Sequence, residues 1–153
     1  MTYSVGLIGC GRIGYLNDIG QDKGTYSYFQ SIKRHKKFKL VAIVDKKKSI
    51  RSEIRKKYKI PAYFSHDRMM REHNPDLVII ATNDPSHYEI LMNIVNYNPK
   101  FVFTEKPLAN TSAEIKKIIN KYKKKQVPLS VNFSRRFSST FNYINDLLKN
   151  NHL

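Results

Sequence analysis

Three glycines at fixed spacing, directly after the first apolar segment, constrain this chain more than any other feature. The segment Tyr3–Ile8 has the pattern of a buried strand. Gly9, Gly11 and Gly14 follow it as Gly-x-Gly-x-x-Gly. In this pattern the first glycine permits a tight turn, the second lets the backbone approach a pyrophosphate, and the third lets a helix pack closely on the strand. The N–H groups at the expected helix start would hold the diphosphate. The pattern favours a dinucleotide-binding turn over a glycine turn in another α/β fold.

A second apolar segment supports this interpretation because it ends in an acid. Leu40–Val44 is followed by Asp45, whose carboxylate can accept hydrogen bonds from the ribose hydroxyls of an adenosine. Asp45 lies 31 residues after Gly14, whereas a separation of about 20 is usual. We expect the excess to fall in Tyr15–Lys23, as an enlarged loop beside the cofactor or active-site cleft.

Short apolar segments alternate with helical patterns along the rest of the chain. Strands are expected at Tyr3–Ile8, Leu40–Val44, Asp76–Ala81, Phe101–Phe103 and Val127–Phe133, with a weaker one at Ala62–Phe64. Helices are expected at Thr25–Lys37, Lys47–Tyr58, Pro85–Tyr97 and Phe137–Lys149. A further helix is expected to begin at the capping box Thr111–Glu114. The apolar residues of the last helix, which we expect to face inward, are Phe141, Ile144, Leu147 and Leu148. Strand–helix–strand repetition implies right-handed crossovers. The chain is therefore predicted to be α/β, a Rossmann-type doubly wound, mostly parallel sheet with helices on both faces.

The charge of the chain is large and unevenly distributed. The 153 residues carry a formal net charge of +16, and residues 33–59 hold 13 Lys or Arg against two acids. A solvated helix face with a loop is the simplest interpretation; attraction of a nucleotide phosphate or another polyanion is the alternative. Nucleic acid is not favoured as a partner, because the basic residues are mostly lysine and few aromatic residues lie between them.

Other features exclude several classes of protein. The single cysteine, Cys10, excludes an intrachain disulfide and a multi-cysteine metal site, and we expect it to be a small packed residue. The histidines show no ligand spacing, so no metal is expected. The apolar run Leu77–Ala81 is too short to span a membrane, and no basic segment precedes the first apolar run as in a signal peptide. These features predict a cytoplasmic protein with no membrane partner.

Several segments, taken in chain order, resemble the N-terminal half of the Gfo/Idh/MocA oxidoreductases, which include glucose–fructose oxidoreductase and inositol dehydrogenase. The matching elements are Gly9–Gly14, Val44-Asp45, Asp76–Thr82 followed by Pro85 and His87, Glu105-Lys106-Pro107, and Val131–Phe137. Glu105-Lys106-Pro107 is the most specific of them. The resemblance covers essentially the whole chain.

The resemblance implies a role for each matching position. Lys106 would be the catalytic residue, beside the nicotinamide and the reacting carbon–oxygen group of the substrate, where an ammonium could stabilise developing alkoxide charge. Glu105 would contact the nicotinamide end of the cofactor. The other cofactor-binding positions are Gly9, Gly11, Arg12, Ile13, Gly14, Asp45, Lys46, Ala81, Thr82, Asn83, His87, Arg135 and Arg136. Of these, His87 would lie near the nicotinamide ribose and Arg135 or Arg136 would close the nicotinamide end.

Each of these roles has a simpler alternative. Glu105-Lys106 could be an ordinary exposed charge pair, His87 a cap or surface histidine, and Arg135-Arg136 surface charge. The cofactor is also open: Asp45 favours NAD because a carboxylate repels a 2′-phosphate, yet Lys46 and the lysines after it could bind that phosphate of NADP. NAD is preferred and NADP is possible.

We expect two parts, residues 1–133 as the dinucleotide-binding domain and 134–153 as the start of a linker or helix. Members of the family carry a second α/β domain that forms the substrate wall and the oligomer surface, and its counterpart is not expected in this chain. The resemblance implies hydride transfer between a nicotinamide and a sugar, polyol or nucleotide-sugar substrate, with weak or no turnover by these residues alone. A homo-oligomer or a partner chain could complete the site. The alternative is a non-catalytic nucleotide-binding or regulatory module.

Overall fold

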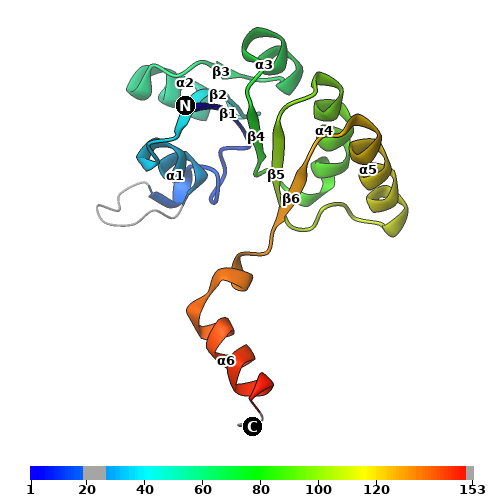
Figure 1. The fold of residues 1–153 in the computed structure, drawn as a ribbon. Helices are drawn as coiled ribbons and strands as arrows, with labels where there is room; N and C mark the ends of the chain where they lie inside the picture. Colours follow the sequence, from blue (N-terminus) through cyan, green and yellow to red (C-terminus); the bar gives the residue numbers. More distant parts are fainter. Residues whose placement is uncertain (19–26, 151–153) are drawn as a thin grey trace.

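Six strands form one sheet at the centre of the molecule (Figure 1). The computed structural model describes residues 1–18 and 27–150. The strands are β1 (Tyr3–Ile8), β2 (Phe38–Val44), β3 (Ala62–Tyr63), β4 (Leu77–Ile80), β5 (Phe101–Glu105) and β6 (Leu129–Asn132). The helices are α1 (Tyr28–Arg34), α2 (Lys48–Tyr58), α3 (His66–His73), α4 (His87–Ile94), α5 (Ser112–Lys125) and α6 (Ser139–Lys149), with 3-10 turns η1 (Leu16–Asp18), η2 (Asp84–Ser86), η3 (Val95–Tyr97) and η4 (Ser134–Phe137).

The strand order is β3-β2-β1-β4-β5-β6, and every pairing is parallel. The chain first moves from β1 outward to β3, then returns past β1 to β4 and moves outward to β6. Because right-handed crossovers in opposite directions place helices on opposite faces, this order produces a doubly wound sheet. The predicted fold class is confirmed.

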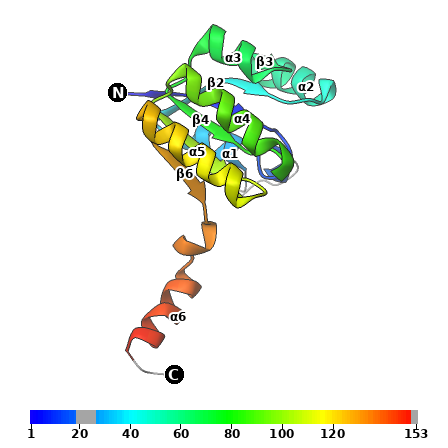
Figure 2. The ribbon, with the colours of Figure 1, turned by 90° about the vertical axis from the view of Figure 1, so that its right-hand side faces the viewer.

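Each face of the sheet has its own apolar core. Phe29 on α1 and Ile54 on α2 pack on one face. Met69 on α3, Leu91 on α4 and Ile118 on α5 pack on the other. Figure 2 shows the two layers, with α4 and α5 in front of the strands and α1 behind them. All five side chains are fully buried.

The helix patterns in the sequence are largely confirmed. The predicted capping box is present: the Thr111 hydroxyl accepts a hydrogen bond from the Glu114 N–H, and the Glu114 carboxylate accepts one from the Thr111 N–H. The sequence patterns did not predict α3, which is short and carries only two buried residues, Met69 and Met70. Its signals are Ser65 at the N-cap position and an acid in the first turn.

The first helix begins later than the glycine pattern predicts. A single turn and η1 follow Gly14, and α1 starts only at Tyr28 after the N-cap residue Ser27. No α-helix begins at the glycines within residues 9–18, so that expected helix start is wrong, whereas the helix predicted at 25–37 is present as α1. Most of the predicted loop at 15–23, and the first two residues of the helix predicted at 25–37, lie outside the described residues. The turn still reaches α1: Tyr28 N donates to Ile13 O and Phe29 N donates to Gly14 O, at 2.9 and 3.0 Å.

The last helix does not pack on the sheet. α6 follows β6 and η4 away from the strands in both ribbon views (Figures 1 and 2). None of its 11 residues is buried, and Phe141 and Ile144 are 47% and 42% exposed. The prediction of inward-facing residues in this helix is wrong, because none of them is buried against the sheet: Phe141, Ile144, Leu147 and Leu148. An amphipathic pattern specifies that a helix has an apolar face, but it does not specify what that face contacts.

Candidate functional site

The glycine turn lies at the carboxyl edge of the sheet, between β1 and the ends of β2 and β4. Gly9 N donates to Val44 O at 2.8 Å, and Ala81 N donates to Ile8 O at 2.7 Å. Gly9 has φ +91°, and a Cβ there would lie 2.6 Å from Ala81 O. At Gly14 a Cβ would lie 2.1 Å from Gly9 O. Both positions therefore require glycine for the turn to close.

Gly11 differs from the other two glycines, because a Cβ at this position would meet no atom of the described residues within 4 Å. The protein itself does not explain a glycine here, so the open space is what a ligand approaching the backbone would need. Arg12 and Ile13, which follow it, are both exposed at the same turn.

Asp45, directly after β2, holds the glycine turn. Its Oδ2 accepts a hydrogen bond from Cys10 N at 2.8 Å, and its Oδ1 accepts one from Lys47 N at 2.7 Å. An ionised carboxylate has about four acceptor positions, so both oxygens retain capacity for ribose hydroxyls. Lys46 is exposed beside it. Arg51 on α2 donates to the carbonyl oxygens of Asp45 and Lys46 and so fixes this loop from below.

Cys10, inside the turn, is fully buried. Burial, and then the nearby Asp45 carboxylate, raise the pKa of its thiol far above the usual value. The thiol stays protonated at neutral pH, which agrees with the expected packing role and not with a nucleophile.

The loop after β4 forms the adjoining wall. Ala81 is buried, Thr82 is partly buried and Asn83 is exposed. The Thr82 hydroxyl oxygen is buried and has no hydrogen-bond partner within residues 1–18 and 27–150. A buried hydroxyl without a partner is costly, so this oxygen marks a position where a bound polar group would be favoured.

His87 links this loop to the segment after β5. Its ring is fully buried, with Nδ1 2.7 Å from Pro107 O and Nε2 3.0 Å from Thr82 O. The alternative of a surface histidine is therefore wrong. A neutral imidazole carries one N–H and donates to one carbonyl at a time. Both nitrogens face backbone carbonyl oxygens, so His87 links the loop after β4 to the segment after β5, and its ring presents no free nitrogen to a ligand.

Glu105 ends β5 and is partly buried in a hydrogen-bonded cluster. Its Oε1 accepts from the Tyr28 hydroxyl at 2.5 Å and from Asn132 Nδ2 at 2.7 Å. Burial, followed by the hydrogen bond to Glu105, raises the pKa of the Tyr28 hydroxyl. Glu105 is therefore not an ordinary exposed charge. Sequence reasoning missed Tyr28 and Asn132, because only the sheet order brings the start of α1 beside the ends of β5 and β6.

Lys106 follows directly and is exposed at the same edge. Arg135 and Arg136 are also exposed, on η4 beyond the end of β6. The Arg135 guanidinium lies 5.6 Å from the ring centroid of Phe141, so it is directed towards α6 in this structure.

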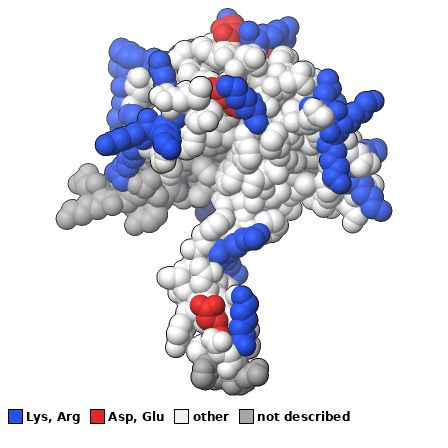
Figure 3. Space-filling view, viewed as in Figure 1, with Lys and Arg blue, Asp and Glu red and all other residues white. Residues whose placement is uncertain are grey.

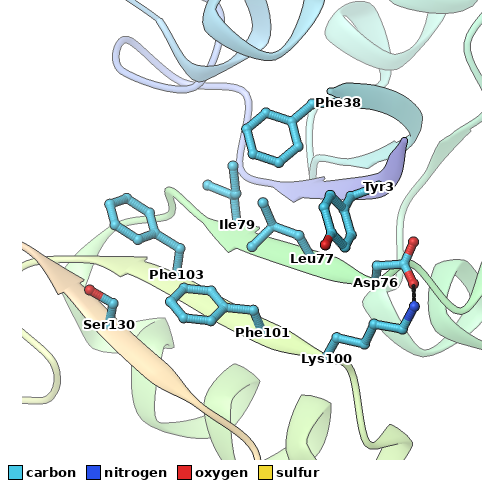
Figure 4. A pocket seen from close by; sticks show the side chains of 9 residues that line it. All are labelled: Tyr3, Phe38, Asp76, Leu77, Ile79, Lys100, Phe101, Phe103 and Ser130. Carbon is cyan, nitrogen blue, oxygen red and sulfur yellow. Dashed lines mark ion pairs between the residues drawn. The ribbon is translucent and has the colours of Figure 1, made fainter. Parts of the chain in front are cut away.

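A hollow lies away from this edge, on the sheet face beside α1 and α2 and nearer the amino ends of the strands (Figure 4). Its walls are Tyr3, Phe38, Asp76, Leu77, Ile79, Lys100, Phe101, Phe103 and Ser130. These side chains are mostly apolar and include none of the predicted site residues. The chemistry-bearing residues therefore gather at the carboxyl edge and not in this hollow.

Figure 3 shows lysine and arginine side chains over the α1–α2 side and over the α5 side, with a largely uncharged surface between them. The last turns of α2 and α5 each carry three basic residues and no acid. The positive charge is thus spread over separate helices. This distribution supports the interpretation of solvated helix faces.

Comparison with known proteins gives the family. The model described as "Oxidoreductase family, NAD-binding Rossmann fold" matches residues 3–133. This chain belongs to the Gfo/Idh/MocA oxidoreductase family. The match ends one residue after β6, where the described chain leaves the sheet.

Relatives within the Gfo/Idh/MocA family agree with the assignment. A myo-inositol 2-dehydrogenase of Thermotoga maritima is 27% identical over 147 residues, covering 95% of this chain. A probable dehydrogenase from Thermotoga maritima, also 27% identical, superposes with a TM-score of 0.79 over 96% of the chain. The WlbA dehydrogenase from Bordetella pertussis, solved in complex with NADH and UDP-GlcNAcA, has the same fold at 22% identity, with a TM-score of 0.82 over 98% of the chain.

The chain spans only part of these Gfo/Idh/MocA relatives, 40% of the curated protein and 41% and 42% of the two solved chains. Residues 3–133 correspond to the NAD-binding Rossmann fold of the family. No helix among the described residues is long and apolar enough to cross a membrane, and these residues contain no cluster of metal-ligating side chains.

Proposed function

We propose that this chain binds NAD(H) along the carboxyl edge of its sheet, as the cofactor-binding part of a dehydrogenase of sugars, polyols or nucleotide sugars. The observation that carries the proposal is the contrast among the glycines. Gly9 and Gly14 are required by protein contacts, whereas Gly11 faces open space and has no such requirement. The unpartnered Thr82 hydroxyl at the same edge also fits a bound polar group.

In this proposal the turn from Gly9 to Gly14, with Arg12 and Ile13, takes the diphosphate. Asp45 accepts hydrogen bonds from the adenosine ribose while it continues to hold Cys10 N. Ala81, Thr82 and Asn83 line one side, supported by His87, and Glu105 lies at the nicotinamide end. Bound NAD supplies a hydride acceptor, and NADH a donor.

Lys106 is the residue we propose for catalysis. It lies at the exposed carboxyl end of β5, next to Glu105, in a position from which an ammonium could orient a substrate hydroxyl and stabilise negative charge on its oxygen. Arg135 and Arg136 would help to close this end of the site. We propose that a homo-oligomer or a partner chain completes substrate positioning and proton exchange.

NAD is preferred to NADP because the Asp45 carboxylate would repel a 2′-phosphate. The lysines Lys46, Lys47 and Lys48 are exposed directly after Asp45 and would attract that phosphate. The closely held Asp45, with both oxygens fixed by backbone N–H groups, is nearer the expected ribose position.

Fluorescence titration with NADH and NADPH tests the proposal directly. We expect NADH to bind more tightly than NADPH, and Asp45→Ala to weaken NADH binding by roughly tenfold or more, as expected for hydrogen bonds to a charged group. Asp84→Ala, an exposed aspartate on η2, is the matched control and should leave affinity unchanged. Absence of NADH binding by the wild type would overturn the proposed function. Tighter NADPH binding would overturn only the NAD preference.

A further inference from the structure

Three side chains from distant parts of the sequence form one hydrogen-bonded cluster at the nicotinamide end of the proposed site. Tyr28 is the first residue of α1, Glu105 the last of β5 and Asn132 the last of β6. The Tyr28 hydroxyl and Asn132 Nδ2 both donate to Glu105 Oε1, at 2.5 and 2.7 Å. Asn132 Nδ2 also donates to the Tyr28 hydroxyl oxygen at 2.7 Å. The three groups thus hold one another in a closed triangle.

The cluster is anchored on both sides. The Tyr28 ring packs edge-on against Phe103 with centroids 5.9 Å apart, and Tyr28 N donates to Ile13 O in the glycine turn. Glu105 and Asn132 are register partners of adjacent parallel strands. The cluster therefore connects the diphosphate turn with the strand end that carries Lys106.

The hydrogen bonds leave the two carboxylate oxygens unequal. Oε1 receives two short donors, whereas among the described residues Oε2 receives only the long contact from Lys106 N at 3.4 Å. Oε2 is thus the oxygen with acceptor capacity remaining, on the side of Lys106. A carboxylate held by one oxygen presents the other in a fixed direction, which lowers the entropy cost of binding a donor there.

We propose that Tyr28 and Asn132 are positioning residues that fix the Glu105 carboxylate so that Oε2 accepts a hydrogen bond from the nicotinamide ribose or carboxamide. This inference rests on the proposed function. It predicts that the cluster contributes to affinity for the nicotinamide nucleoside half of the cofactor and not for the adenosine diphosphate half.

The test compares NADH with ADP, which shares the adenosine and the diphosphate but lacks the nicotinamide nucleoside. Calorimetric titration of the 153-residue protein should show Tyr28→Phe binding NADH roughly tenfold more weakly, the effect of one hydrogen bond involving a charged group, while ADP affinity changes less than about twofold. Tyr97→Phe is the matched control, because the Tyr97 hydroxyl also donates to a carboxylate, Asp67, in a different part of the molecule. It should change neither affinity.

A double-mutant cycle separates positioning from a general loss of structure. If Tyr28 acts through Glu105, Tyr28→Phe should have little further effect on NADH affinity in a Glu105→Ala background. Additive losses, or an equal loss for NADH and ADP, would overturn the inference and leave the proposed function standing. Wild-type protein that binds neither ligand would overturn both.

Asn132→Val provides a second route if Tyr28→Phe does not fold, as judged by thermal unfolding. It removes the other donor to Oε1 and should give the same selective loss for NADH. Unchanged NADH affinity in this variant would overturn the inference.

Discussion

The three fingerprint glycines meet different physical requirements. Gly9 needs a positive φ and a close approach to the β4 loop, and Gly14 has no room for a Cβ against Gly9 O. Gly11 has ample room and no need for glycine in the protein as it stands. The motif therefore combines two residues that shape the turn with one, Gly11, where the described residues leave open space, which the proposed function assigns to the diphosphate.

This difference predicts opposite outcomes for two alanine variants. Gly9→Ala should lower the free energy of unfolding by about 1–3 kcal/mol, through backbone strain and the clash with Ala81 O. Gly11→Ala should change it by less than about 0.5 kcal/mol while weakening NADH binding severalfold. Urea unfolding and NADH titration of both variants check this. A stable Gly9→Ala, or full NADH affinity in Gly11→Ala, would contradict the assignment.

Asp76 gives a residue-level prediction about pH. Its carboxylate accepts hydrogen bonds from Lys100 Nζ at 2.7 Å and from the side chain and backbone N–H of Ser4, which together lower its pKa to about 2. A pKa that is lower in the folded than in the unfolded state contributes stability above the unfolded value, and that contribution disappears as pH falls through the folded one.

Wild type should therefore lose an increment of thermal stability between about pH 4 and pH 2 that Asp76→Asn does not lose. Melting curves of both proteins from pH 6 to 2 measure this difference, which should be largest near neutral pH and shrink towards pH 2. Parallel curves over the whole range would show that the Asp76 contacts do not matter for acid stability.

At the scale of elements, the sequence predicted helices better than it predicted what they contact. α5 begins with the predicted capping box, and its Ile118 is fully buried. α6 has the same kind of apolar pattern, yet Ile144 is 42% exposed. The apolar spacing of a helix is a property of a few consecutive residues. Which surface the apolar face contacts depends on where the helix lies in the tertiary structure.

The same substitution in these two helices should have very different effects. Ile118→Ala should cost about 2–5 kcal/mol, because it leaves a cavity between α5 and the sheet. Ile144→Ala should change the free energy of unfolding by less than about 0.5 kcal/mol, because this side chain is exposed and its truncation leaves no cavity. Denaturant unfolding of the 153-residue protein measures both. A large loss for Ile144→Ala would mean that α6 packs on an apolar surface in solution.

At the scale of the whole molecule, the charge of +16 lies in separate groups of basic side chains on the face that Figure 3 shows. Many of these cations have local structural contacts. Arg51 caps backbone carbonyls, and Lys33 lies 4.4 Å from the ring centroid of Tyr58. The other Lys and Arg side chains repel one another in solvent, and this repulsion destabilises the compact state.

Salt should therefore stabilise the fold. Raising NaCl from about 0.01 M to about 0.15 M shortens the Debye length from about 30 Å to about 8 Å, so the thermal midpoint should rise. A matched series in a neutral osmolyte separates screening from preferential exclusion. A midpoint that falls or stays level with NaCl would contradict net repulsion as the dominant effect of this charge.

Sequence alone determined the fold class and most elements of the candidate site, because strand periodicity, glycine spacing and an acid at a strand end are local patterns with fixed physical meanings. It also identified the family through Glu105-Lys106-Pro107, and the match over residues 3–133 bears this out. Only the tertiary structure decided that His87 is buried between two loops, that α6 lies away from the sheet, and that Tyr28 and Asn132 join Glu105. These features depend on contacts between residues as far apart as 104 positions, and the parallel sheet order is what brings such residues together.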